Sequence, residues 1–198
     1  MARNSGLLFL SAFMRSPRSV GSVAPSSPSL GRVMARHIDT SRPGVVVELG
    51  GGTGAISRAL LDNGIAAERL IVLERDPDLY CHLCREVPKA TIVHGDALNL
   101  KGILADLKVE CVNTVVSCIP MLTLPPQIQH DLYRVSFDVM EGSGGEILQY
   151  TYGIGCPVSK KVLHNLDAKG RPVNVVLMNI PPATVWRFAR GRTPRRGG

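Results

Sequence analysis

The residues best placed to do chemistry form a short glycine segment behind an acid, Glu48-Leu49-Gly50-Gly51-Gly52-Thr53-Gly54. Glycines at this spacing let the backbone turn tightly and approach a ligand closely, because no Cβ atom intervenes. A dinucleotide-binding loop would instead carry Gly-x-Gly-x-x-Gly. The segment therefore indicates a nucleotide-like ligand of another kind, and a tight turn without a ligand is the alternative.

Two further acids lie where a ligand on this segment would reach them. Glu74 ends the next predicted strand, 69–74, and Asp96 follows the strand predicted at 90–93. A carboxylate accepts hydrogen bonds from two vicinal hydroxyls or from an amine N–H. The alternatives are a solvent-facing charge for Glu74 and a helix cap for Asp96, and a cap is compatible with ligand contact.

Buried apolar runs alternate with helical patterns along the chain, and such repeating units predict a doubly wound α/β fold with a mostly parallel, seven-stranded sheet. The predicted strands are 45–49, 69–74, 90–93, 113–117, 146–152, 173–178 and 184–188, and the predicted helices are 29–37, 55–61, 77–86, 102–107 and 127–140. No helix separates the last two strands, so we expect an antiparallel hairpin at one sheet edge. We divide this single domain into N-terminal amphipathic and covering helices, a core and a basic tail, at 1–42, 43–190 and 191–198.

With these acids, residues 44–189 resemble the class I S-adenosylmethionine-dependent methyltransferases. The resemblance implies that the glycine loop lies against the methionine part of the cofactor, that Glu74 holds the ribose hydroxyls and that Asp96 accepts a hydrogen bond from the adenine amino group. The cofactor contacts that it implies are those of Ser22, Glu48, Gly50, Gly51, Gly52, Thr53, Gly54, Glu74, Arg75, Asp96, Ala97, Ser117, Ile119 and Pro120.

A closer resemblance is to the bacterial phospholipid N-methyltransferases that convert phosphatidylethanolamine to phosphatidylcholine, which share features with ribosomal RNA adenine dimethyltransferases. It is carried by residues 18–27, 48–54, 117–125, 149–153 and 181–186. The resemblance implies stepwise N-methylation of phosphatidylethanolamine through mono- and dimethyl forms. It also implies a bacterial cytoplasmic protein that associates peripherally with the inner membrane.

An RNA adenine N6-methyltransferase is the main alternative, and the net charge of +7 favours it. Enzymes that methylate nucleobase amines carry an Asn or Asp, two prolines and an aromatic residue after the fourth strand. This chain has Ser117-Cys118-Ile119-Pro120-Met121 there, and only 5% of its residues are aromatic, so we expect no nucleic acid partner. A catalytically silent cofactor- or membrane-binding module is a further alternative, which the three acids disfavour.

The basic N-terminus predicts contact with an anionic membrane surface. Residues 1–20 form an amphipathic helical pattern, apolar along Leu7, Leu10, Phe13 and Met14, and are too short to span a bilayer, which takes about 20 apolar residues. Packing on the core is the alternative, and we do not expect export. Lipid phosphate would be bound by the guanidinium groups of Arg15, Arg18 and Arg187.

Two tyrosines near the end of the fifth strand, Tyr150 and Tyr152, are the candidates for catalysis. A tyrosine face attracts a methylated ammonium and its hydroxyl bonds to an amine, whereas core packing is the alternative. Taking the two to alternate along the strand, we expect one of them to point away from the site. The five scattered cysteines predict no disulfide framework and no metal site, and the oligomeric state and general base stay open.

Overall fold

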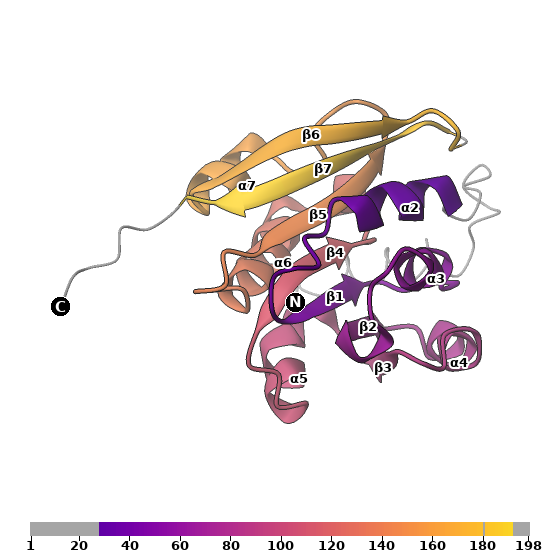
Figure 1. Cartoon of the computed structure of the whole chain (residues 1–198). Coiled ribbons are helices and arrows are strands. Elements are labelled where there is room, and N and C mark those ends of the chain that lie inside the picture. The colour runs from indigo at the N-terminus through magenta and orange to yellow at the C-terminus, as the bar shows by residue number, and fades with distance from the viewer. Residues whose placement is uncertain (1–27, 180, 192–198) are drawn as a thin grey trace.

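The computed structural model describes residues 28–179 and 181–191 of the 198-residue chain. Seven strands form one sheet in the order β3-β2-β1-β4-β5-β7-β6 (Figure 1). Neighbours among β1 to β5 are parallel, and β7 is antiparallel to both β5 and β6. The strands are β1 (Val45–Leu49), β2 (Leu70–Glu74), β3 (Thr91–His94), β4 (Val112–Ser117), β5 (Glu146–Tyr152), β6 (Ala168–Val176) and β7 (Ala183–Arg190). The predicted doubly wound sheet with an antiparallel edge hairpin is confirmed.

Strand β1 lies at the point where the order of the strands reverses. It pairs with β2 on one side and with β4 on the other, and the chain reaches β3 before it returns to β4. In open α/β sheets, ligands bind in the crevice at the carboxyl ends of the strands beside such a reversal. The glycine segment follows β1 directly, so the fold places it in this crevice.

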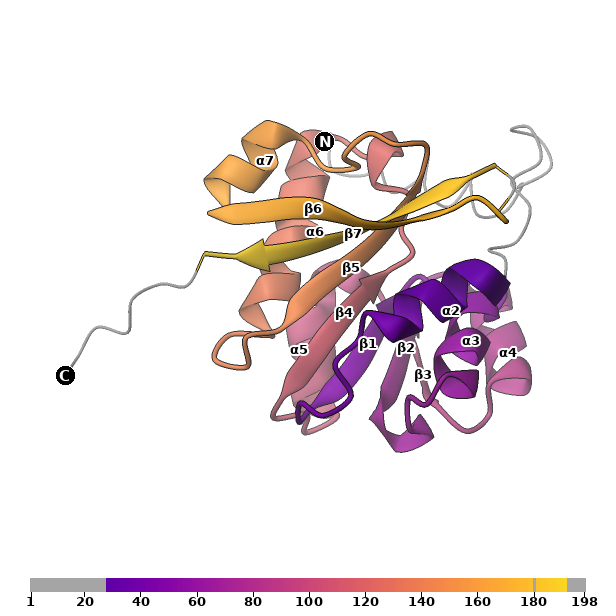
Figure 2. The ribbon, with the colours of Figure 1, turned by 45° about the horizontal axis from the view of Figure 1, so that its top comes forward.

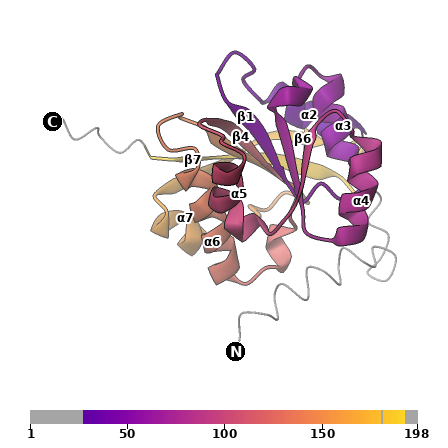
Figure 3. The ribbon, with the colours of Figure 1, turned by 90° about the horizontal axis from the view of Figure 1, so that it is seen from below.

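Helices cover both faces of the sheet (Figures 2 and 3). One face carries α2 (Pro28–Arg36), α3 (Ala55–Asp62) and α4 (Pro77–Glu86), and the other carries α5 (Leu100–Asp106), α6 (Pro126–Asp138) and α7 (Lys160–Asn165). Three short 3-10 helices, η2 (Ala67–Arg69), η3 (Ala97–Asn99) and η4 (Met121–Thr123), lie in the connections. Each helical layer encloses its own core, and the adjacent residues Val115 and Val116 of β4 point into opposite cores. That alternation explains why the central strands are continuous apolar runs.

Helix α2 packs against α3 at a glycine. A Cβ atom on Gly31 would collide with the Cβ of Ala59, so the two helices approach more closely there than larger residues would permit. Leu30 and Met34 of the same helix are fully buried in the core on this face. Helix α2 is therefore part of the hydrophobic core.

The structure differs from the sequence prediction at the hairpin and at α7. Strand β6 ends at Val176 instead of 178, because the apolar Leu177 and Met178 lie in the turn, where they are 75% and 80% exposed. Helix α7 was not predicted, because its six residues are too few to show a helical period. The Ser159 hydroxyl caps this helix by accepting a hydrogen bond from the Val162 backbone N–H.

Several predictions concern residues outside the described part of the chain. The amphipathic helix at 1–20, with Arg15 and Arg18, falls there, and so do Ser22 and most of the basic tail. Within residues 28–179 and 181–191, none of the helices has the length and apolar character needed to cross a bilayer.

Candidate cofactor and acceptor site

The glycine loop has a backbone that few other residues would adopt. Gly50, Gly52 and Gly54 have φ angles of 81°, 55° and 75°, in the left-handed region that favours glycine. Gly51 is required for a different reason, since a Cβ atom there would collide with the side chains of Val72 and Leu83. The loop bonds back to the sheet, with the Gly50 N–H donating to the Leu73 carbonyl at 2.8 Å. The loop is thus a close-fitting backbone surface at the end of β1.

Glu74, predicted to hold the ribose, lies beside this loop and is 2% exposed. Its Oε2 accepts a hydrogen bond from the Gly52 N–H at 2.8 Å, and its Oε1 accepts from the N–H groups of Arg75 and Asp76 at 2.7 and 2.9 Å. A carboxylate has about four acceptor positions, so three are occupied. Glu74 therefore joins the end of β2 to the loop and keeps one acceptor position for a ligand.

Asp96, predicted to reach the adenine, caps a short helix. Its Oδ1 accepts a hydrogen bond from the Leu98 N–H at 2.9 Å at the start of η3, and its Oδ2 lies 3.9 Å from the Nε of Arg75. The side chains of Arg75 and Asp96 are 45% and 37% exposed. The structure thus brings Arg75, Asp96 and the adjacent Ala97 to the same sheet edge as Glu74, and the cap leaves Oδ2 open to a ligand.

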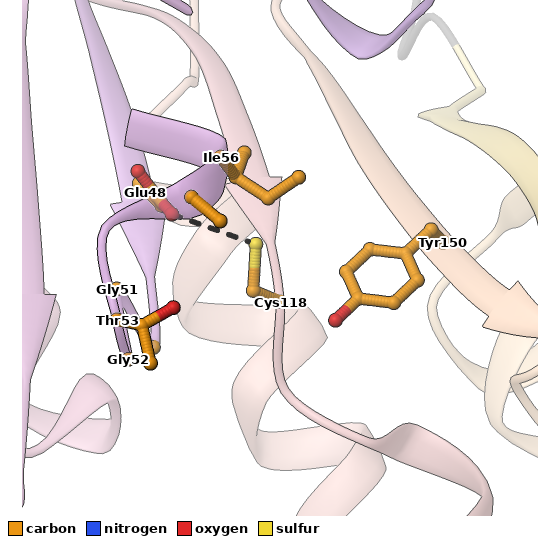
Figure 4. A pocket seen from close by; sticks show the side chains of 9 residues that line it. Glu48, Gly51, Gly52, Thr53, Ile56, Cys118 and Tyr150 are labelled. Atoms are coloured by element: carbon orange, nitrogen blue, oxygen red, sulfur yellow. Dashed lines mark hydrogen bonds between the residues drawn. The ribbon is translucent and has the colours of Figure 1, made fainter. Parts of the chain in front are cut away.

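A pocket opens between the glycine loop, β4 and β5 (Figure 4). It is lined by Glu48, Gly50, Gly51, Gly52, Thr53, Ala55, Ile56, Cys118 and Tyr150. Five of the predicted cofactor residues, Glu48 and loop residues 50–53, therefore share one cavity with one of the two candidate tyrosines. The pocket thus places Tyr150, the candidate residue for contact with the methyl acceptor, next to the glycine loop.

Glu48 is fully buried at this pocket and carries an unusual pKa. Burial disfavours the carboxylate and raises its pKa from 4.5 to about 8, and the nearby charge of Glu74 adds to the rise. Hydrogen bonds from the Ser57 hydroxyl at 2.6 Å and the Cys118 thiol at 3.7 Å oppose the rise without cancelling it. Glu48 is therefore mainly neutral at pH 7 in the ligand-free pocket.

The cofactor contacts predicted for Ser117, Ile119 and Pro120 stay predictions, and the structure shows where these residues of the connection after β4 lie. Ser117 is buried, pairs in register with Gln149 of β5, and is not among the residues that line the pocket. Ile119 packs into the core on the α6 side and touches the position where Gly50 would carry a Cβ, and Pro120 is half-buried before η4. Of residues 117–120, Cys118 alone lines the pocket.

Cys118 was missed as a site residue, although the sequence holds a signal for it. Val116 pairs in register with Glu48, and paired residues of parallel strands point to the same face. Cys118 is two residues beyond Val116, so strand alternation directs its side chain toward Glu48. Burial raises the pKa of the Cys118 thiol well above its usual value, which keeps the thiol protonated as a hydrogen-bond donor.

Tyr150 and Tyr152 lie on the same face of β5, so the prediction that one of them points away from the site is wrong. Residues two apart on a strand share a face. The two rings lie 5.8 Å apart between centroids at an angle of 75°. Tyr150 lines the pocket and Tyr152 does not, and both pack against the core on the α2 side.

Arg187 does not lie at the pocket. Its Nη2 donates to the His37 carbonyl at 3.1 Å, and its Nε lies 3.4 Å from an oxygen of Glu146, the first residue of β5. The guanidinium is thus held near the amino end of β5, whereas the pocket lies at the carboxyl ends of the strands. We therefore do not include Arg187 among the residues that could bind a lipid phosphate.

Comparison with the sequences of known proteins identifies the family to which the chain belongs. No family model matches the chain. Over 141 residues, the chain is 41% identical to an ornithine lipid N-methyltransferase from Singulisphaera acidiphila, and the match covers 69% of this chain and 73% of the relative. The chain belongs to the family of lipid N-methyltransferases. Its predicted membership of such a family is confirmed.

Other similarities are to methyltransferases that act on other acceptors. A shorter match, 43% identical over 61 residues, is to a probable ribosomal RNA small subunit methyltransferase A from Natronomonas pharaonis; it covers 28% of this chain and 21% of that protein. An O-methyltransferase from Bacillus cereus, solved in complex with S-adenosylhomocysteine, shares the fold with a TM-score of 0.65 at 10% identity, covering 96% of this chain and 93% of that chain. This lipid N-methyltransferase family member is an S-adenosylmethionine-dependent methyltransferase, and the predicted cofactor is confirmed.

Proposed function

We propose that this methyltransferase transfers the methyl group of S-adenosylmethionine to the primary amine of a membrane lipid headgroup. The observation that carries the proposal is the 41% identity with an ornithine lipid N-methyltransferase over 141 residues. An ornithine lipid is the first acceptor that we propose. Phosphatidylethanolamine, predicted from the sequence, is the second, and stepwise transfer to it would lead through mono- and dimethyl forms to phosphatidylcholine.

The charges at the pocket do not distinguish the two headgroups. None of the pocket-lining residues in the described part of the chain is a cation, and Arg187 is held by Glu146 elsewhere. Each headgroup carries an amine and an anionic group, a carboxylate in an ornithine lipid and a phosphate in phosphatidylethanolamine, and either anion would need a cation or N–H donors outside this set of residues. The order in which we propose the two acceptors therefore rests on the identity with the ornithine lipid N-methyltransferase.

The cofactor half of the proposed site consists of the glycine loop and the acids beside it. The close-fitting backbone at Gly51, the free acceptor position of Glu74 and the open Oδ2 of Asp96 match a cofactor with an extended polar chain, ribose hydroxyls and an amino group. Glu48 adds a fully buried carboxyl group to the lining of the pocket. A nearby cation, such as the sulfonium of S-adenosylmethionine, would favour the ionised form of Glu48. The residues named in this paragraph therefore fit this cofactor.

The chain's own residues have a limited task in the transfer. S-adenosylmethionine supplies an activated methyl group on a positively charged sulfur. The pocket walls at Ile56, Cys118 and Tyr150 would exclude water and align the amine nitrogen in line with that methyl group. Alignment of two reactants is worth about 7–11 kcal/mol of the barrier. Positioning thus accounts for most of the catalysis that we propose.

Tyr150 is the residue that we place against the acceptor amine. It lies on the opposite side of Cys118 from Glu48 in the pocket (Figure 4). Its ring would attract the ammonium group that forms as methyl groups are added, by about 0.5–2 kcal/mol. Tyr152 would support the ring, because the two tyrosines pack edge to face.

An acceptor assay tests this function. The protein is incubated with labelled S-adenosylmethionine in separate reactions that contain vesicles with ornithine lipid, vesicles with phosphatidylethanolamine, or RNA, and initial rates are compared. We expect label in a lipid, fastest with ornithine lipid. Label that appears only in RNA would establish the alternative function and reject a lipid acceptor.

A lipid acceptor also implies where the protein works. We propose that it acts at the surface of the inner membrane from the cytoplasmic side, as a peripheral protein. The N-terminal segment with Arg15 and Arg18 remains a proposed contact with anionic lipid. Deletion of residues 1–14 is expected to weaken binding to anionic liposomes while cofactor binding stays intact, and unchanged liposome binding would reject the contact.

A further inference from the structure

Large exposed apolar side chains gather at one edge of the sheet. Among the described residues, six large hydrophobic side chains are exposed, namely Leu107, Leu122, Ile154, Val175, Leu177 and Met178. Leu107 follows α5 and precedes the start of β4, whereas the other five lie at or beyond the carboxyl ends of β4, β5 and β6. Single exposed apolar residues are ordinary, but a cluster on one edge marks a binding surface.

The most exposed four form what we call the apolar rim: Leu122 (62% exposed), Ile154 (85%), Leu177 (75%) and Met178 (80%). They come from three separate connections, the one after β4, the one after β5 and the β6–β7 turn. Residues 118–125, 153–159 and 177–182, which make up these connections, contain no Asp or Glu. The rim is thus apolar and carries no acidic charge.

Hydrogen bonds hold these connections together. The Gly153 N–H donates to the Pro182 carbonyl at 3.2 Å, and the Thr184 hydroxyl donates to the Gly153 carbonyl at 2.6 Å. The Gln149 side chain donates from β5 to the Ile119 carbonyl in the connection after β4, at 3.0 Å. These bonds join the connection after β5 to the end of the β6–β7 turn, and β5 to the connection after β4, so all three connections that carry the rim are tied to β5 or to its end.

The apolar rim lies on the same edge as the pocket. Cys118 begins the connection that carries Leu122, and Tyr150 lies four residues before Ile154. Both residues line the pocket, so its wall continues into the loops of the rim. The β6–β7 turn extends past the ends of the central strands on the side where α2 begins (Figures 1 and 2).

Charge beside the rim favours a lipid surface as its partner. Lys160 and Lys161 are exposed at the start of α7, directly after the connection that carries Ile154. Exposed apolar residues flanked by lysines match a bilayer, in which acyl chains lie beneath anionic headgroups. A partner protein with a basic surface would not match these lysines.

We propose that the apolar rim inserts into the bilayer interface and thereby places the pocket mouth at the level of the lipid headgroups. This proposal rests on the lipid acceptor proposed above. It identifies the apolar rim as the surface that brings the pocket to the lipid. A headgroup would then reach Tyr150 and Cys118 without leaving the membrane. This surface acts in addition to any contact of the N-terminal segment.

Insertion of one rim residue into the bilayer can be measured separately from any membrane contact of the N-terminal segment. The chain has one tryptophan, Trp186, which is 9% exposed in the core and supplies a constant background. Full-length Met178→Trp is mixed with vesicles of phosphatidylethanolamine and phosphatidylglycerol, with brominated acyl chains as quenchers. We expect a blue shift and at least twofold quenching of the added fluorescence. The matched control Leu107→Trp, at the opposite edge, is expected to show neither.

A second variant tests whether the rim contributes to binding. Full-length Ile154→Ser combined with Leu177→Ser is expected to lower the vesicle partition coefficient about tenfold, to leave S-adenosylmethionine affinity within twofold and to retain methyl transfer to micellar lipid. Absence of quenching at position 178 in vesicle-bound protein, equal quenching at 107, or unchanged partition would each overturn the proposal. Rim binding without methylation of any lipid would reject the proposed function instead, so the two failures are distinguishable.

Discussion

The cofactor half and the acceptor half of the site are held in place differently. At the glycine loop, backbone geometry and the bonds of Glu74 to three N–H groups leave little freedom. On the acceptor side, Cys118 and Tyr150 line the pocket through their side chains, and the adjoining loops expose apolar side chains. We therefore expect cofactor binding to depend on backbone geometry, and acceptor recognition to depend on individual side chains and on the apolar rim.

The largest effect is expected at a glycine of the cofactor half. In Gly51→Leu the new side chain would collide with Val72 and Leu83, and such overpacking costs about 1–3 kcal/mol, or about 2–12 °C in Tm. We expect that fall in a thermal melt and loss of S-adenosylmethionine binding by calorimetry. The matched control from the acceptor half is Gly155→Ala, where a Cβ would meet no atom within 4 Å. Equal losses of Tm and of S-adenosylmethionine binding in the two variants would contradict the difference that we describe between the cofactor half and the acceptor half.

The next largest effect concerns Glu74. Glu74→Gln replaces an acceptor oxygen by an N–H₂ group that faces backbone N–H donors, and hydrogen bonds to charged groups contribute about 1.5–3 kcal/mol. We expect S-adenosylmethionine affinity to fall about 10- to 150-fold in a calorimetric titration. Glu86→Gln, which removes an exposed pair with Arg58, is the control and should bind normally. Normal binding by Glu74→Gln would show that the ribose contact is absent.

A smaller effect is expected on the acceptor side. Tyr150→Ala removes a ring that lines the pocket and should lower kcat/KM for the lipid about 2- to 30-fold, the equivalent of about 0.5–2 kcal/mol. Tyr150→Phe keeps the ring and removes the hydroxyl, so comparison with Tyr150→Ala shows how much each group contributes. Tyr152→Ala should act more weakly, because Tyr152 does not line the pocket. If Tyr152→Ala proves the more damaging variant in steady-state assays, the assignment of the two tyrosines must be exchanged.

A further effect, on the pH dependence of stability and binding, is expected from Glu48. Its pKa rises from 4.5 to about 8 on folding, so between these values the folded ligand-free protein binds more protons than the unfolded chain. Stability should therefore fall as pH rises from 5 toward 8. S-adenosylmethionine affinity should rise over the same range, because a cationic ligand favours the carboxylate. Glu48→Gln should flatten both slopes in melts and titrations, and slopes that persist in this variant would assign them to another group.

Sequence reasoning worked best where burial and backbone geometry restrict the residue type. The strands Val45–Leu49 and Glu146–Tyr152 and the helix Pro77–Glu86 have their predicted bounds, because their apolar runs and the proline at the helix start are direct consequences of packing. The positions of Glu48, Glu74 and the glycines at strand ends follow from the same pattern, and their contacts with a cofactor stay predictions.

It failed where position depends on tertiary contacts. The sequence prediction omits Cys118 from the pocket, because the strand pairing that directs its side chain toward Glu48 is a tertiary feature. The expectation of opposite faces for the two tyrosines misapplies strand periodicity, and Arg187 is a candidate by charge alone although Glu146 holds it. The predicted strand includes Leu177 and Met178, because hydrophobicity does not distinguish a buried strand residue from an exposed turn residue.

The central claim, methyl transfer to a lipid amine, is tested most directly by one competition reaction. The protein is given S-adenosylmethionine with a deuterated methyl group and a mixture of ornithine lipid, phosphatidylethanolamine and RNA, and the products are analysed by tandem mass spectrometry, with Glu74→Gln as the matched control. We predict deuteromethyl groups on a lipid headgroup nitrogen, and fewer of them with Glu74→Gln at an S-adenosylmethionine concentration that does not saturate the variant. Deuteromethyl groups on RNA alone, or unlabelled lipid from protein that binds the cofactor, would contradict the claim.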